Sequence, residues 1–121
     1  MTNIVLVFAT RMTTTLLVQR LKKVAKDNQV DVNIKTVSEA DCKNIADDVR
    51  IIMIGPQLLY NLDVLKDIYG PRGVKILVIH KEDFESIDAP RILADAMASI
   101  GQKELKTKLG FKDAEKFPLQ N

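Results

Sequence analysis

The sequence predicts a single α/β domain in which helices cover both faces of an open, four-stranded parallel sheet. Short apolar runs that are typical of strands alternate along the chain with segments whose apolar residues recur at helical spacing. Parallel strands need crossover connections, and right-handed crossovers place helices on both faces of a sheet. The predicted strand order is 2-1-3-4, and 121 residues suit one domain of common size.

The first half of the chain contains two predicted strands and two predicted helices. Residues 3–8 form a continuous aliphatic run, as expected of a strand covered on both faces. After the polar stretch 9–13, helical spacing predicts the first helix, and the alternation in 30–37 predicts an edge strand with one wet face. Ser38 is a plausible N-cap for a second helix, whose apolar stripe comprises Cys42, Ile45, Ala46 and Val49.

The second half continues this alternation. Residues 50–54 predict a third strand that stops at Gly55–Pro56, and residues 74–79 predict a fourth strand. Between them lies a predicted helix with an apolar stripe of Leu58, Leu62, Leu65 and Tyr69. A loop leads to a last helix with Pro90 in or near its first turn, and the apolar stripe of this helix comprises Ile92, Leu93, Ala96, Met97 and Ile100.

The helical pattern weakens after residue 102. Leu105 and Leu109 could extend a helix, but Gly110 and Pro118 break the pattern. We therefore expect residues 1–102 to form the domain and residues 103–121 to form a partly ordered C-terminal extension.

Composition argues against several classes of protein. One Cys and one His cannot form a disulfide or a four-ligand metal site of the usual kind, so we expect no metal and no cofactor. The net charge of +2 and the scattered lysines argue against a nucleic-acid or membrane footprint. No segment approaches the roughly 18 apolar residues of a membrane span, so we expect no direct membrane insertion. With one Cys and no predicted membrane span, the composition best fits a protein of the reducing cytoplasm.

The predicted topology also places a candidate site. Ligands of open parallel sheets bind at the carboxyl ends of the strands, where the strand order reverses. For the order 2-1-3-4 this point lies between the ends of the first and third strands, next to residues 9–13 and 55–57. The residues expected to line this cleft are Gly55, Pro56, Gln57, Tyr60, His80 and Phe84.

Residues 12–18 (MTTTLLV) and 54–60 (IGPQLLY) form two loop motifs that resemble those of enzyme IIB of the lactose/cellobiose/chitobiose sugar phosphotransferase family. That family begins with an apolar strand ending in Cys and a loop of the type CxAGMSTSLLV. Residues 12–18 (MTTTLLV) match the second half of this loop, and residues 54–60 (IGPQLLY) match a second family motif. The resemblance extends over roughly residues 3–100. It implies a phosphate-binding loop that comprises Ala9, Thr10, Arg11, Met12, Thr13, Thr14 and Thr15.

The resemblance implies a cytoplasmic component of phosphoenolpyruvate-dependent oligosaccharide uptake, of the cellobiose or lactose type. In that family the Cys accepts a phosphoryl group from a IIA partner and passes it to a sugar held by the membrane partner IIC. The reaction needs a thiolate at a helix N-terminus, where free N–H groups hold the phosphoryl oxygens. Here the nucleophile position is Phe8, and the family's loop Gly is Arg11. We therefore expect IIA-like and IIC-like partners, impaired phosphoryl transfer and no assignable catalytic residue.

Other interpretations of these residues remain open. Arg11 and the threonines 13–15 could bind phosphate or sulfate, although Thr13 could simply cap the helix. His80 could replace the nucleophile, but about 10 Å separates the first and fourth strands at about 4.8 Å per strand, which favours an ordinary strand-end His. The chain could also be a regulatory module in which Phe8 docks a partner. Cys42 is expected in the core and not as a nucleophile.

Overall fold

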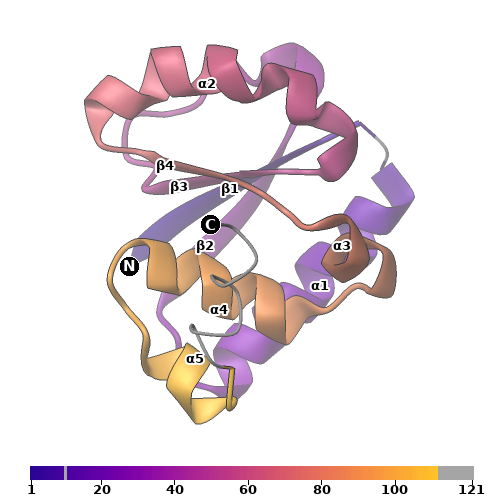
Figure 1. Cartoon of the computed structure of the whole chain (residues 1–121), viewed down its shortest axis with the longest axis vertical. Helices are drawn as coiled ribbons and strands as arrows, with labels where there is room; N and C mark the ends of the chain where they lie inside the picture. Colours follow the sequence, from indigo (N-terminus) through magenta and orange to yellow (C-terminus); the bar gives the residue numbers. More distant parts are fainter. Residues whose placement is uncertain (10, 112–121) are drawn as a thin grey trace, which may run out of the picture.

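Four parallel strands form the sheet of the computed structural model, in the predicted order β2-β1-β3-β4 (Figure 1). Val7 pairs with Val37 on one side and with Ile54 on the other, and Ile54 pairs with Val78. The predicted fold class and strand order are therefore confirmed. The strands are β1 (Thr2–Phe8), β2 (Val32–Ser38), β3 (Ile51–Ile54) and β4 (Lys75–Val78). The structure describes residues 1–9 and 11–111, and of residues 11–14 only the helical backbone.

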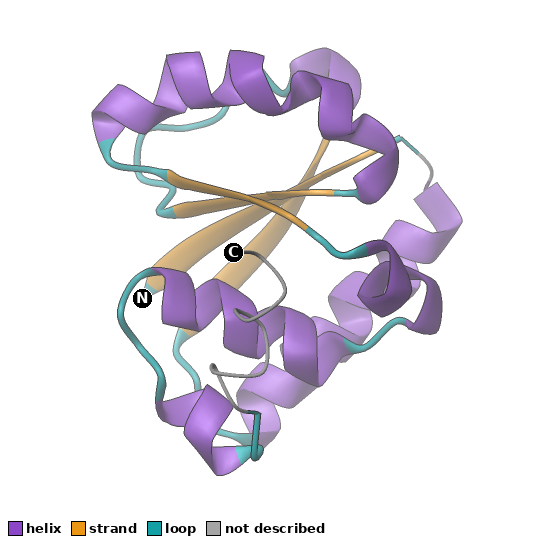
Figure 2. Cartoon of the chain, viewed as in Figure 1, coloured by secondary structure: helices purple, strands orange, loops and turns teal. Residues whose placement is uncertain are grey.

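Helices cover both faces of the sheet, which separates them in Figure 2. On one face α1 packs beside α4, and α2 lies on the other face. The α-helices are α1 (Arg11–Asp27), α2 (Leu62–Tyr69), α3 (Lys81–Ser86), α4 (Ala89–Ser99) and α5 (Glu104–Lys108). Short 3-10 turns are η1 (Glu39–Asp41), η2 (Pro56–Asn61) and η3 (Gly70–Arg72).

Strand β1 supplies side chains to the core on both faces of the sheet. Because side chains of a strand alternate between faces, Ile4, Leu6 and Phe8 enter the core under α1 and α4. Val5 and Val7 enter the core under α2. All five side chains are buried, which explains why this strand is a continuous apolar run and not an alternating one.

The predicted helix after Ser38 is absent, and the prediction was wrong. Beyond η1 the chain runs through turns and irregular backbone as far as residue 50. Cys42 and Ile45 are buried, but Ala46 is exposed. The apolar spacing thus reflected burial and not helical periodicity. Ser38 does not cap a helix, because its hydroxyl donates to the Asp41 carboxylate at 3.2 Å.

A buried tyrosine stabilises this irregular crossover in place of helical hydrogen bonds. The Tyr69 hydroxyl at the end of α2 donates to the Cys42 carbonyl at 2.8 Å and accepts from the Ile45 N–H at 3.0 Å. Tyr69 is only 1% exposed, so these bonds lie where water cannot replace them. One side chain therefore satisfies two backbone groups that a helix would otherwise have paired.

A second difference is α3, which occupies a segment predicted as a loop. It spans six residues, too few for an apolar period to be visible in the sequence. It ends at Ile87, whose φ of 53° lies in the left-handed region. In the next helix, α4, Pro90 lies in the first turn as predicted, and the structure adds that Asp88 caps the helix by accepting the Arg91 N–H at 3.2 Å.

Part of the predicted extension is ordered against the domain. In α5, Leu105 is buried in the core under α4, and the buried Lys106 forms an ion pair with Asp95 at 3.4 Å. Residues 112–121 lie outside the described part of the chain. The domain boundary at residue 102 stays a prediction.

Substituting Tyr69→Phe should lower the free energy of unfolding by about 1–3 kcal/mol, because it leaves the Cys42 carbonyl and the Ile45 N–H buried without a partner. Denaturant unfolding followed by circular dichroism measures the change. The matched control is Tyr60→Phe, at an exposed tyrosine whose hydrogen bond to Glu39 can be replaced by water, so this variant should lose clearly less stability. Equal losses in the two variants would contradict this role of Tyr69.

Candidate functional site

The ring of Phe8 occupies the carboxyl end of β1, where the strand order reverses. Its side chain is only 6% exposed and lies against the ring of Phe84 from α3, with centroids 5.4 Å apart and planes inclined by 25°. Phe84 is itself 5% exposed. The two rings thus form a stacked pair that closes the core at this edge of the sheet.

Gly55 follows β3 and lies directly against the Phe8 ring. A Cβ atom at this position would stand 2.8 Å from Cδ1 of Phe8 and 2.8 Å from Oε1 of Gln57. Gly55 has a φ of −65°, which any residue adopts, so the requirement for glycine here is the close approach of the ring. Gln57 is exposed and flexible enough to move, whereas the buried ring is not.

Burial of Phe8 has a direct consequence for two of the predictions. A phenyl ring offers no lone pair for phosphoryl transfer, and a buried ring cannot touch a partner. The hypothesis that Phe8 is a docking residue was therefore wrong: packing against Phe84 and Gly55 covers it. At the carboxyl end of β1, the Phe8 ring thus fills the space between Phe84 and Gly55.

The helix after β1 begins earlier than the sequence predicts. Helix α1 begins at Arg11, so Thr13 lies inside its first turn and does not cap it. This turn contains no acidic residue. Of the predicted phosphate loop, Ala9 and Thr15 are exposed, Thr10 lies outside the described residues, and residues 11–14 are described as helical backbone alone.

A second group of polar side chains joins η1 to η2 beside the predicted cleft. Tyr60 donates its hydroxyl hydrogen to the Glu39 carboxylate, and the Asn61 amide donates to the same Oε2 atom at 2.9 Å. These hydrogen bonds lower the pKa of Glu39, with that from Tyr60 the larger cause. The bond to Glu39 also raises the pKa of Tyr60. No sequence pattern pointed to Glu39 or Asn61, because they lie 22 positions apart.

The same edge exposes a short apolar surface. Leu59, Tyr60 and Val64 are 55%, 68% and 40% exposed, and they follow one another along η2 and the start of α2. Of the residues predicted to line the cleft, Pro56 is half-buried at the start of η2. The structure therefore brings Gly55, Gln57 and Phe84 to Phe8, while Tyr60 turns to Glu39.

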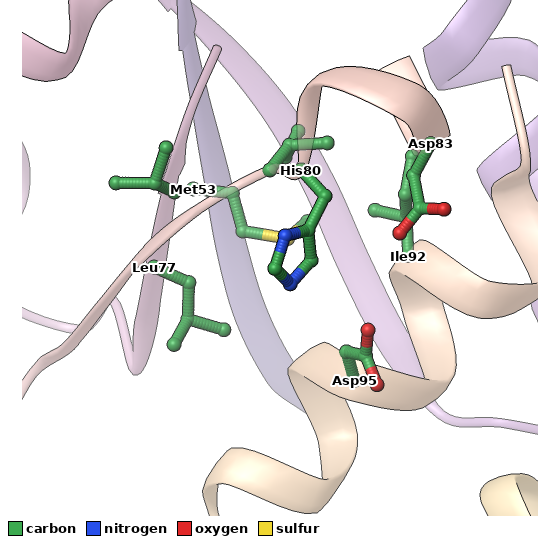
Figure 3. A pocket seen from close by; sticks show the side chains of 8 residues that line it. Met53, Leu77, His80, Asp83, Ile92 and Asp95 are labelled. Atoms are coloured by element: carbon green, nitrogen blue, oxygen red, sulfur yellow. The ribbon is translucent and has the colours of Figure 1, made fainter. Parts of the chain in front are cut away.

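His80 lies in a different pocket, on the side of β4 that faces α4 (Figure 3). Its imidazole extends into an open cavity of about 30 Å³, with Met53 and Leu77 on one side and Asp83 and Asp95 on the other. Burial raises the pKa of the Asp83 carboxyl. Phe8 does not line this pocket. That His80 is an ordinary strand-end histidine and not a replacement nucleophile stays a prediction.

Two other kinds of site are absent from the described residues. Within residues 1–9 and 11–111, no group of three or more His, Cys, Asp or Glu side chains is arranged to hold a metal ion. Among the same residues, no helix combines the length and the apolar character needed to span a bilayer.

Comparison with known proteins gives a family and a fold. A family model described as "PTS system, Lactose/Cellobiose specific IIB subunit" matches residues 3–111. The cellobiose-specific phosphotransferase IIB component of Borrelia burgdorferi is 28% identical, with a TM-score of 0.68 over 84% of this chain and 94% of that chain. The lactose-specific IIB component domain of Streptococcus pneumoniae, 14% identical, shares the fold with a TM-score of 0.69 over 78% of this chain and 96% of that chain. None of the curated proteins matches this sequence.

Substituting Gly55→Ala should destabilise the native chain by about 1–3 kcal/mol, because the new methyl group overlaps the Phe8 ring. In a Phe8→Cys background the same substitution should cost much less. A double-mutant cycle by chemical unfolding measures the difference. Gly70→Ala is the control, since a Cβ there meets nothing within 4 Å and its φ is −55°. An equal cost of Gly55→Ala in both backgrounds would show that the Phe8 contact is not the cause.

Substituting Glu39→Gln should lower the pKa of Tyr60 toward its usual value, because the hydroxyl loses its anionic acceptor. Ultraviolet titration of tyrosinate reports this change, with Asp41→Asn as a control on the same 3-10 turn. For Glu39 the pKa shift is in the opposite direction, because its pKa in the folded chain is lowered. The hydrogen bonds to its carboxylate therefore stabilise the fold at pH values above the usual pKa of Glu, and this stabilisation is lost as the pH falls through the lowered pKa. An unshifted Tyr60 in Glu39→Gln would refute the coupling.

Proposed function

This chain belongs to the lactose/cellobiose-specific IIB family of the phosphotransferase system, and we propose that it is a IIB component impaired in cysteine phosphoryl transfer. The system would be a phosphoenolpyruvate-dependent one for an oligosaccharide of the cellobiose or lactose type, acting in the cytoplasm. The observation that carries the proposal is the buried ring of Phe8 at the end of β1.

The chemistry of the missing step supports this proposal. Covalent transfer needs a nucleophile with a free electron pair that is open to an incoming phosphoryl donor. Phe8 supplies neither, because its ring is a hydrocarbon and is packed between Gly55 and Phe84. The loss is therefore both chemical and steric.

The remaining cysteine does not offer a substitute. Cys42 is 3% exposed and belongs to the core on the α2 side of the sheet, whereas Phe8 belongs to the core on the α1 side. Burial raises the pKa of the Cys42 thiol, which lowers the fraction of reactive thiolate. A phosphoryl donor directed to the end of β1 would meet no thiol there.

We further propose that the chain retains contacts with IIA-like and IIC-like proteins. The support is the exposed surface of Leu59, Tyr60 and Val64, which lies at the same edge of the sheet as Phe8. Large apolar side chains that remain exposed in a small domain favour a protein contact. This surface does not need the chemistry at Phe8 in order to bind.

A second candidate function is anion binding by a regulatory module on the same fold. The first turn of α1 contains no acidic residue, and free N–H groups at a helix start favour phosphate or sulfate. Titration with inorganic phosphate should then shift the backbone amide resonances of residues 9–15 more than those of α4. Shifts spread evenly over the chain would contradict this function.

Incubation with a phosphorylated IIA protein tests the main proposal. The native chain should take up no stable phosphoryl label, while Phe8→Cys/Arg11→Gly, which restores a thiol and the family's loop glycine, should become labelled. The matched control is Phe8→Ala/Arg11→Gly, which opens the same space without a nucleophile. Labelled residues are identified by mass spectrometry, and circular dichroism shows that each variant is folded. Stable labelling of the native chain at any residue would overturn the proposal.

A further inference from the structure

The small net charge of the chain conceals an uneven distribution. Helix α1 contains five basic residues and one acidic residue, a net charge of +4, while the whole chain carries +2. The rest of the chain therefore carries −2. Residues 38–69, which form the crossover, β3 and α2, contain six acidic and three basic residues. Since α1 and α2 lie on opposite faces of the sheet, the basic helix and this acidic segment lie on opposite sides of it (Figure 1), although residues 81–99 on the α1 side also contain five acidic and two basic residues.

The lysines of α1 share one side of the helix. Leu17, Leu21 and Ala25 face the core and are buried. On the opposite side, four exposed residues follow the spacing i, i+3, i+4 and i+7 of a single helical face, namely Gln19, Lys22, Lys23 and Lys26. The exposed Arg20 lies beside this face. We call Arg20, Lys22, Lys23 and Lys26 the basic face.

Few side chains of the basic face form hydrogen bonds or ion pairs within the described part of the chain. Lys23 pairs with Asp27 at 3.2 Å, but its side chain is 76% exposed, so this is a weak surface pair. No hydrogen bond or ion pair within the described chain engages the side chains of Arg20, Lys22 or Lys26. Lys26 in the last turn favours the helix dipole, but Arg20 and Lys22 lie too far from the helix end to do so. Folding alone therefore does not account for the cluster.

We propose that the basic face binds the surface of a bilayer that contains anionic lipids, without insertion. Clusters of four or more Lys and Arg on a helix are attracted to anionic headgroups, and each basic residue near the surface strengthens binding roughly fivefold. When the chain is bound through its basic face, the acidic segment 38–69 lies on the side of the sheet that faces away from the negatively charged lipids. The proposal is independent of the loss of phosphoryl transfer at Phe8.

A lipid surface fits this face better than an acidic protein does. Protein interfaces are enriched in aromatic residues and Arg and depleted in Lys, whereas the basic face contains three Lys and one Arg. On α1 the one large apolar side chain that is exposed, among residues 15–27, is Leu16, which precedes the basic face. The face therefore offers diffuse charge without an apolar anchor, which suits headgroup attraction and not a specific interface.

Sedimentation of the native chain with lipid vesicles tests the proposal. The chain should bind vesicles made of equal parts phosphatidylglycerol and phosphatidylcholine, but not vesicles of phosphatidylcholine alone, and added salt should weaken binding. The variant Lys22→Gln/Lys23→Gln/Lys26→Gln should bind the mixed vesicles roughly 100-fold more weakly. The matched control is Lys43→Gln/Lys75→Gln/Lys81→Gln, which removes the same charge from exposed lysines elsewhere and should bind nearly as the native chain.

Three outcomes would overturn the proposal. The first is equal binding, or no binding, to the two kinds of vesicle. The second is an equal loss in the two triple variants, which would show that net charge alone matters. The third is binding of the native chain to polyglutamate and not to vesicles, which would assign the basic face to an acidic protein. Circular dichroism establishes that both variants fold, since all six lysines are exposed.

Discussion

Burial of one phenyl ring at the carboxyl end of β1 is the constraint on which the candidate site depends. Removing such a ring from water contributes about 1.5–3 kcal/mol, and Phe8 obtains this by packing against Phe84 and the bare backbone of Gly55. The contact joins β1, the turn after β3 and the short helix α3. The edge of the sheet at which the family resemblance implies a nucleophile is therefore part of the core.

The opposite side of the sheet shows a different use of a buried aromatic residue. Tyr69 contributes a hydroxyl as well as a ring, and it pairs two backbone groups of the crossover after β2. Because these groups are satisfied, the crossover remains irregular and still buries Cys42. The only cysteine of the chain is thus a core side chain on the face of the sheet that lies away from Phe8.

Sequence reasoning succeeded where one residue type has one physical consequence. The continuous apolar run of β1 required burial on both faces, and Pro90 marked the start of α4. It failed where two structures satisfy the same pattern. Cys42 and Ile45 are spaced as in a helix, but burial against α2 meets the same requirement without one. Helix α3 is too short to display a period, so its position was not visible.

The amino-acid pattern was sufficient to predict the fold class and the strand order and to show that position 8 holds no nucleophile, since these follow from the order of apolar runs and the identity of one residue. Packing in three dimensions was needed to place the Phe8 ring inward against Phe84 and to join Glu39 to Tyr60. The physical reason is that these features join segments distant in sequence or depend on which side of an element faces the core. Local propensity does not specify either of these.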